Sequence, residues 1–243
     1  MQKDILDTFI KVNKLFPGNS NSLHKLGMEA KKLENAAIDQ IIKTMALKNK
    51  DIIFVSNKDE ARALSILGYL DKYIGKNKTI ITTDMESDNV LNILNELAKE
   101  DFLIKKIKTN NSVIIDKDLI NEIDKNVVLI TLSNIDNQKE LLSEVKKHSL
   151  ALVYIDASDK LDTLVNYNDT NFLTFDARIV NGIEGIALLI KDKTIVITPL
   201  LHGGKSSTIY RSGTPALPFI VSFSKAIRLW YENKKWVNTI TRW

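Results

Sequence analysis

The chain has 243 residues, which is enough for one large α/β domain with a small addition. Its net charge of +4 comes from lysines interleaved with acidic residues, a pattern that favours an ordinary solvated surface over a nucleic-acid face. The absence of cysteine excludes disulfides, thiolate metal sites and a cysteine nucleophile from this chain, and the three histidines are too widely spaced to indicate a metal site. Since no apolar run is typical of a signal peptide or a membrane span, we expect a cytoplasmic protein with no membrane partner.

Residues 1–48 are predicted to form an N-terminal helical segment. A short amphipathic helix over residues 3–14 is ended by Pro17-Gly18. Ser22 is expected to cap a longer helix that runs to about Leu47.

Residues 49–215 are predicted to form an α/β domain, because short apolar runs alternate with helical periodicity. Strands are expected at 51–55, 79–83, 103–107, 127–132, 150–155, 172–175, 186–191 and 194–198, the last two joined as a hairpin, with helices at 59–73, 87–99, 116–124 and 138–148. This order predicts a three-layer fold, a mostly parallel sheet with helices on both faces. Residues 216–243 are predicted to form a C-terminal helical segment, with its helix over 216–237.

The segments that follow the predicted parallel strands are the first places to look for a functional site. In open α/β sheets the ligand crevice lies beyond the carboxyl ends of the strands. We therefore expect the site at residues 56–60, 83–87, 132–137 and 156–159.

Five segments of the chain are each similar to a motif of one enzyme family. They are Gly18–His24, which resembles G-N-P-S-S-x-H; Phe54–Leu64, which resembles F-T-S-G-A-T-E-A-x-x-L; Tyr154–Asp159, which resembles H-V-D-A-x-Q; residues 174–190, which resemble S-x-H-K-x-x-G-P-x-G-x-G-x-L; and His202–Thr214, which resembles H-G-G-G-x-E-x-G-x-R-S-G-T. Their order and spacing make the chain similar to the cysteine desulfurases of the class V aminotransferase group, which have pyridoxal-phosphate (PLP) fold type I. The resemblance covers about residues 5–235 and implies a PLP-dependent transferase-like large domain, truncated so that the small C-terminal domain is missing.

The resemblance also implies that the cofactor site is degenerate. The lysine that forms the imine with PLP is matched by Arg178, whose guanidinium stays protonated and cannot form that bond. The phosphate-binding threonine is matched by Asp59, the ring-stacking histidine by Ser87, and the glutamine near the ring hydroxyl by Asp159. Because a carboxylate at Asp59 would repel a phosphate, we interpret it as a cap for the following helix.

Other positions of the family site are kept. Asp156 matches the aspartate that pairs with the pyridinium nitrogen, and Asn134 matches the asparagine beside the ring. Arg211 and Thr214 match R-S-G-T, whose threonine in the family reaches the phosphate of the neighbouring subunit. Structural roles fit these residues equally well, since Asp156 ends a buried strand and the Arg-Ser-Gly-Thr segment is suited to a turn at a dimer interface. No working site is predicted from these vestigial positions.

Other interpretations of the lysines in this region are weak. Gly204-Lys-Ser206 has the ending of a P-loop, but the first glycine of that motif would fall at Pro199. Lys58 and Lys205 are alternatives for the imine lysine, yet Lys58 lies in the phosphate turn and Lys205 in a glycine turn expected to face a partner subunit.

We therefore expect a catalytically inactive homologue that acts as a scaffold and holds no cofactor, or PLP only non-covalently. It is expected to form a homodimer, or a heterodimer with a related desulfurase. Trp230, Trp236 and Trp243 would add an apolar surface, unless they fold back onto the core. The alternatives are a PLP-binding enzyme with an atypical site, a nucleic-acid-binding protein, and a product without a selected function. The crevice is expected to be narrower than the family's, with Arg178 and Phe175 as candidates to fill it.

Overall fold

The computed structural model describes residues 3–110, 113–114, 116–133, 140–162, 165–204, 206 and 208–240. Its α-helices are α1 (Lys3–Leu15), α2 (Lys25–Thr44), α3 (Lys58–Leu70), α4 (Asp88–Ala98), α5 (Asp116–Asn121), α6 (Leu141–His148) and α7 (Leu217–Ile240). Its strands are β1 (Lys50–Val55), β2 (Thr79–Thr83), β3 (Leu103–Ile107), β4 (Val127–Ser133), β5 (Leu152–Asp156), β6 (Phe172–Asp176) and β7 (Ala187–Asp192). Among these described residues, no helix is long and apolar enough to cross a lipid bilayer.

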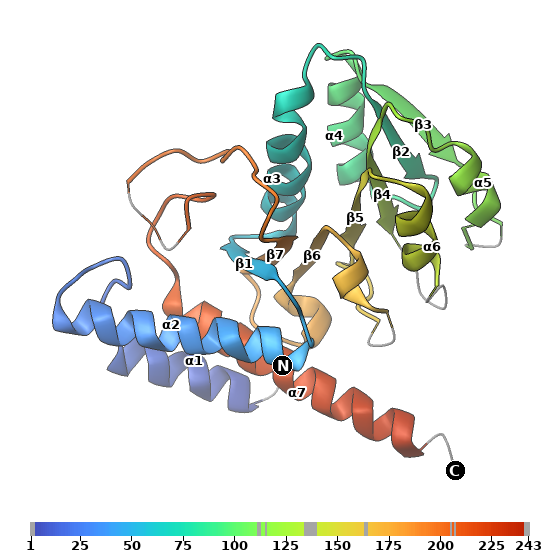
Figure 1. Cartoon of the computed structure of the whole chain (residues 1–243). Helices are drawn as coiled ribbons and strands as arrows, with labels where there is room; N and C mark the ends of the chain where they lie inside the picture. Colours follow the sequence, from blue (N-terminus) through green and yellow to red (C-terminus); the bar gives the residue numbers. More distant parts are fainter. Residues whose placement is uncertain are drawn as a thin grey trace.

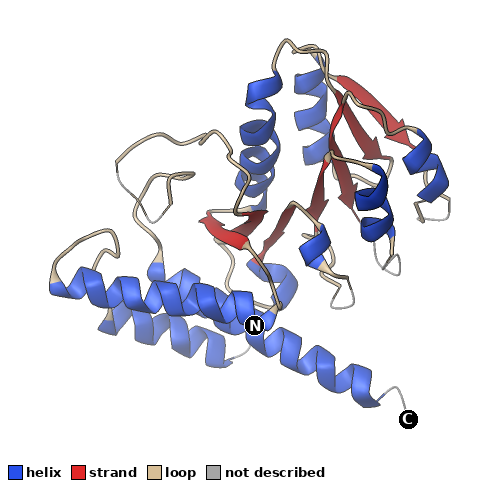
Figure 2. Ribbon diagram, viewed as in Figure 1, coloured by secondary structure: helices blue, strands red, loops and turns tan. Residues whose placement is uncertain are grey.

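The strands form one sheet in the order β1-β7-β6-β5-β4-β2-β3 (Figure 2). Neighbouring strands are parallel except at β7, which runs antiparallel to both β1 and β6. The prediction of a mostly parallel sheet is therefore confirmed.

The predicted strand at 194–198 and its hairpin are wrong. β7 already has hydrogen-bonded neighbours on both edges, so the chain leaves the sheet after it. The segment packs against α3 instead, where the Thr198 N–H donates to the Gly68 carbonyl at 2.8 Å. Ile195 and Ile197 are buried in the same cluster as the apolar face of α3, which accounts for the alternating pattern without a strand.

Helices cover both faces of the sheet. Successive residues of a strand point to opposite faces, and on β5 the side chains of Val153 and Ile155 join one hydrophobic cluster while Tyr154 joins another. The first cluster includes residues of α2, α5, α6 and α7, and the second includes residues of α3 and α4. The core is thus divided by the sheet, as the three-layer prediction requires.

The helices at the two ends of the chain lie side by side. Figure 1 shows α1, α2 and α7 together, with α7 crossing the other two, and the Ser224 hydroxyl on α7 donates to the Ala37 carbonyl on α2 at 2.9 Å. The helices α1 and α2 of the predicted segment 1–48 therefore share one helical layer with α7 of the predicted segment 216–243, although the boundaries of these segments stay predictions. Trp230 packs partly buried against the first cluster, in line with the fold-back alternative. Trp243 and the side chain of Trp236 lie outside the described residues.

The N-terminus of α2 differs from the prediction. His24 is the N-cap, and its Nδ1 accepts a hydrogen bond from the Gly27 N–H at 3.2 Å. Ser22, the predicted cap, lies two residues earlier in the turn that leads to the helix, where its N–H donates to the Asn19 carbonyl. An imidazole therefore takes the role that residue preferences assign to serine.

Two ion pairs fix the register of β1 on β7. Lys50 lies opposite Asp192 and Asp51 lies opposite Lys191, and their side chains pair at 2.6 and 2.8 Å respectively. Both lysine side chains are almost fully buried. A slip of one residue would leave two buried ammonium groups without their carboxylates, which is strongly unfavourable. The pairs lie at the amino end of β1, and by fixing its register they also set the position of its carboxyl end, where the candidate site begins.

Candidate functional site

Three of the expected loops meet at the carboxyl edge of the sheet. Asp59 follows β1, Glu86 follows β2, and Asp156 ends β5, beside Ser133 at the end of β4. Polar side chains from the segments expected to hold a site therefore lie at this edge. Asn134, the other predicted residue after β4, lies outside the described residues.

Arg62 is the centre of this cluster, and it was not among the predicted site residues. Its Nε and Nη2 both donate to one carboxylate oxygen of Asp156, at 2.8 and 2.6 Å. Its Nη1 donates to Asp59 at 2.8 Å. The other oxygen of Asp156 accepts from the Ser158 N–H at 3.0 Å, so both carboxylate oxygens are engaged. The buried Arg62 guanidinium is thus paired with the carboxylate that the family resemblance assigned to the pyridinium nitrogen of the cofactor.

Asp59 is not the cap of α3. The N-cap is Asn57, whose side-chain oxygen accepts from the Glu60 N–H at 2.9 Å. Asp59 lies in the first turn, where its carboxylate pairs with Arg62 and also accepts a hydrogen bond from Asn89. The carboxylate therefore serves as the second acceptor for the buried guanidinium, a role that the capping interpretation overlooked.

Glu86 is a second buried acid at the same edge. The Ser133 hydroxyl donates to its Oε2 at 2.5 Å, while its Oε1 is buried and has no hydrogen-bond partner among the described residues. Burial raises the pKa of the Glu86 carboxyl to about 7, and the nearby Asp156 charge adds to the shift. Within the same described part of the chain, the buried hydroxyls of Ser87 and Ser158 also lack partners. Ser87, matched to the ring-stacking histidine, offers no aromatic face.

Arg178 lies apart from this buried cluster. Its side chain is half exposed, and its Nε and Nη2 donate to Asp176 at 3.1 and 3.0 Å. The hydrogen bond to Asp176 raises the pKa of the Arg178 guanidinium above its ordinary value. Phe175 is fully buried in the core, where its ring meets that of Phe223 at 5.8 Å. Neither of these two candidates is the partner of Asp156, which is paired with Arg62.

A cavity of about 210 Å³ remains beside Arg178. Its walls come from residues 56–59, 176–178 and 184–186, and they carry cations and carboxylates together. Asp159, matched to the family glutamine, is exposed and is not among the residues that line this cavity. No group of three or more metal-ligating side chains occurs among the residues that the structure describes.

Arg211 and Thr214 lie at the far end of β1 from the ion pairs with β7. The Arg211 guanidinium donates to Glu60 at 2.6 Å and to the Ser56 hydroxyl at 3.0 Å. The Thr214 hydroxyl accepts from the Asn19 amide at 3.3 Å. The loop before α7 is therefore held against the start of α3 and the turn before α2 within the same chain.

Comparison with known proteins identifies the family. A model of the class V aminotransferase family matches residues 2–241, so the chain belongs to that family. It is similar to cysteine desulfurase IscS 1 of Archaeoglobus fulgidus, with 25% identity over 228 residues, and to cysteine desulfurase IscS of Dictyoglomus turgidum, with 28% identity over 222 residues. These matches cover 90% and 87% of this chain but only 59% and 56% of the relatives.

Solved structures agree with the fold. A NifS-like protein superposes with a TM-score of 0.89 at 24% identity, and the match covers 96% of this chain and 67% of that one. DndA from Streptomyces lividans superposes with a TM-score of 0.82 at 19% identity, covering 96% of this chain and 70% of its own. The architecture of this chain is therefore that of the PLP-dependent transferase fold.

The side chains present here do not fit PLP as the family binds it. The acid that the resemblance matches to the ring nitrogen is already paired with Arg62. The segment matched to the phosphate turn carries the Asp59 carboxylate, and the position matched to the imine lysine carries Arg178. A phosphate dianion next to Asp59 would be repelled, and a guanidinium forms no imine. The side chains therefore fail to match PLP at three places: its ring nitrogen, its phosphate and the carbon that would form the imine.

Proposed function

We propose that this chain is a catalytically inactive member of the class V aminotransferase family, which holds no PLP and acts as a scaffold for a partner. The observation that carries the proposal is the ion pair between Arg62 and Asp156, because an internal cation takes the place of the cofactor's ring nitrogen. Arg178 in the imine position supports the proposal independently, since it removes the covalent link as well.

The burial of Arg62 makes its displacement unfavourable. To pair with a pyridinium, Asp156 must release a guanidinium whose side chain is only 2% exposed, and Arg62 would then keep Asp59 as its acid partner. Breaking a buried ion pair costs about 3–5 kcal/mol. That cost corresponds to a loss of roughly two to four powers of ten in cofactor affinity.

A titration of the purified protein with PLP tests the inactive state. We expect no saturable change in visible absorbance or thermal stability, for the natural chain or for Asp156→Ala. As a positive control, Arg62→Asn combined with Arg178→Lys frees the acid and restores an amine, and should gain absorbance at saturating PLP. Saturable binding by the natural chain that Asp156→Ala abolishes would establish the alternative, a PLP-binding enzyme. Borohydride reduction and peptide mapping would then identify the lysine that carries the cofactor.

We propose that the partner is a second copy of this chain. Exposed apolar side chains occur in two segments that lie together: Leu23 and Leu26 at the start of α2, and Ile209 in the loop before α7. The Asn19 amide ties these segments by its hydrogen bond to Thr214. Apolar surface of this kind is normally covered in an assembly. The loop before α7 also carries the Arg-Ser-Gly-Thr segment, which in the resembled family reaches the neighbouring subunit.

Sedimentation at micromolar concentrations tests self-association. We expect the natural chain to sediment as a dimer, and Leu23→Glu with Ile209→Glu to sediment as a folded monomer. Leu150→Glu is the matched control, because Leu150 is fully exposed between α6 and β5, away from the two segments. A natural chain that stays monomeric would rule out the homodimer. Co-sedimentation with a full-length cysteine desulfurase would then decide on the heterodimer.

A further inference from the structure

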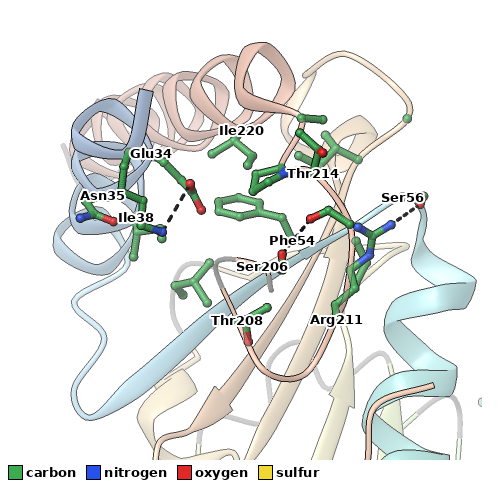
Figure 3. Close-up of a pocket in the computed structure, with 18 residues that line it drawn as sticks. Glu34, Asn35, Ile38, Phe54, Ser56, Ser206, Thr208, Arg211, Thr214 and Ile220 are labelled. Atoms are coloured by element: carbon green, nitrogen blue, oxygen red, sulfur yellow. Dashed lines mark hydrogen bonds and ion pairs between the residues drawn. The ribbon is translucent and has the colours of Figure 1, made fainter. Parts of the chain in front are cut away.

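A second cavity lies on the opposite side of β1 from α3. It measures about 280 Å³ and is enclosed by α2, β1 and the start of α7, together with the loop before α7 (Figure 3). Much of its wall is apolar, formed by Ile38 from α2, Ile52 and Phe54 from β1, and Ile220 from α7. The size and lining fit a small organic molecule, at the lower end of the range for ligand pockets.

Glu34 places a buried carboxylate in the wall of this cavity. Figure 3 shows the carboxylate directed towards the ring of Phe54. Its side chain is 2% exposed, and its Oε2 has no hydrogen-bond partner among the described residues. Among the described residues, the cation that pairs with it is the Lys31 ammonium at 3.5 Å, and the Lys31 side chain is itself 36% exposed. Charge-assisted hydrogen bonds normally measure about 2.7–2.9 Å, so this contact leaves the carboxylate poorly compensated.

The cation on the other side of the cavity is already satisfied. Arg211 lies beyond Phe54 from Glu34 in Figure 3, and its guanidinium donates to Glu60 and to the Ser56 hydroxyl. The Lys31 ammonium shares the loose contact with Glu34, but its side chain is partly exposed to water. Among the described residues of the wall, the buried charge that lacks a close partner is therefore negative. A ligand that complements this cavity must bring a cation to Glu34 and apolar atoms to Phe54 and the isoleucines.

We propose that this cavity is a binding site for a small primary amine that carries an apolar body. The ammonium group donates to Glu34 and replaces the loose contact with Lys31, while the apolar body packs against Phe54, Ile38 and Ile220. The site shares no residue with the Arg62 cluster, although Arg211 and Thr214, two of the vestigial cofactor positions, also line it. It does not depend on whether the chain is inactive.

Phenethylamine is a suitable probe because it joins an ammonium group to one aromatic ring. Calorimetric titration of the full chain at pH 7.5 should give saturable binding at one site. Methyl resonances of Ile38, Ile52 and Ile220 should shift in the same titration, which locates the probe. 2-Phenylethanol has the same body without the charge, and should bind roughly tenfold more weakly or worse, as expected for a lost hydrogen bond between charged groups.

Variants of α2 separate a binding role for Glu34 from a structural one. Glu34→Gln should weaken phenethylamine binding roughly tenfold without lowering the thermal stability of the free protein. Glu144→Gln is the matched control, because Glu144 also pairs with a lysine three residues on, Lys147, at the surface of α6. Lys31→Met removes the internal competitor and should tighten binding.

Three results would overturn the proposal. They are the absence of saturable binding at millimolar phenethylamine, equal affinity for the alcohol, and affinity that Glu34→Gln leaves unchanged. A loss of stability in Glu34→Gln would show that the carboxylate serves the fold, and an unchanged affinity in Lys31→Met would show that the lysine does not compete.

Discussion

Two nitrogens of the Arg62 guanidinium share one carboxylate oxygen of Asp156, at 2.8 and 2.6 Å, inside the protein. The side chains are 2% and 4% exposed, so neither charge is compensated by bulk water. An apolar pair of similar volume would often be at least as stable, because both charges must be desolvated. The ion pair therefore indicates that Arg62 on α3 and Asp156 on β5 each depend on the other for compensation of a buried charge. It does not by itself indicate that the pair raises the free energy of unfolding.

The interdependence of Arg62 and Asp156 predicts strong coupling in a double-mutant cycle. Arg62→Met should lower the free energy of unfolding by about 3–5 kcal/mol, because it leaves the Asp156 carboxylate buried without its main partner. Asp156→Asn should lower the free energy of unfolding by a similar amount, because it leaves the buried Arg62 guanidinium without its main carboxylate partner. The double variant should lose less free energy of unfolding than the two single variants lose together. The difference, which is the coupling energy of the pair, should be about 1–3 kcal/mol when measured by urea unfolding.

The exposed pair Arg228 and Glu232 on α7 is the control for this cycle. Its atoms are 2.8 Å apart, but the side chains are 36% and 53% exposed. Arg228→Met and Glu232→Gln should each change the free energy of unfolding by less than about 0.5 kcal/mol, with little coupling. If the losses at Arg62 and Asp156 were additive, the two side chains would not interact energetically as the buried ion pair requires.

Glu86 should make the stability depend on pH between about 4.5 and 7. Its carboxyl has a pKa of about 7 in the folded chain against 4.5 as the reference, so the folded state keeps its proton longer than the unfolded state. Stability contributed by the neutral acid is present below the unfolded pKa and is lost as the pH rises through the folded pKa. At about 1.4 kcal/mol for each unit, the loss is on the order of 3 kcal/mol.

The variant Glu86→Gln tests this dependence. Gln stays neutral, so the variant should match the natural chain near pH 4.5 and be the more stable of the two at pH 8, as measured by thermal unfolding across the range. A stability difference that is the same at both pH values would show that Glu86 does not titrate there.

The sequence predicted the elements well because periodicity reports which face of a helix or strand is buried. It also placed Asp59 and Asp156 at one edge, since parallel strands bring their carboxyl ends together. It missed Arg62, although a signal was present: the arginine lies on the buried side of α3, next to Ala61, where an unpaired charge is not tolerated. Which acid would pair with it depended on the tertiary arrangement of α3 and β5, and this is not visible in local patterns.

The buried Lys191 should contribute more to the free energy of unfolding than the exposed Lys193. Its ammonium donates to Asp51 at 2.8 Å, to the Asp192 carbonyl at 3.1 Å and to the Ile195 carbonyl at 2.8 Å. Lys191→Met keeps the apolar stem but leaves these acceptors without their donor. The free energy of unfolding should fall by about 2–3 kcal/mol in urea. Lys193→Met, at an exposed position, should change it by less than about 0.5 kcal/mol, and equal effects would contradict the network.

Gly68 should resist the replacement by alanine that usually stabilises a helix. Alanine in a helix interior is favoured over glycine by about 1 kcal/mol. Here, however, a Cβ at residue 68 would lie 2.6 Å from the Thr198 carbonyl oxygen, which belongs to the segment that packs on α3. Gly68→Ala should therefore lower the free energy of unfolding by about 1–3 kcal/mol, because backbone must move apart. Gly204→Ala, where a Cβ meets nothing within 4 Å, should be neutral or slightly stabilising in the same urea titration. If Gly68→Ala were instead as stable as the natural chain, residues 193–198 would not pack against α3 as described, and the same segment would have to find another route from β7 to the loop before α7.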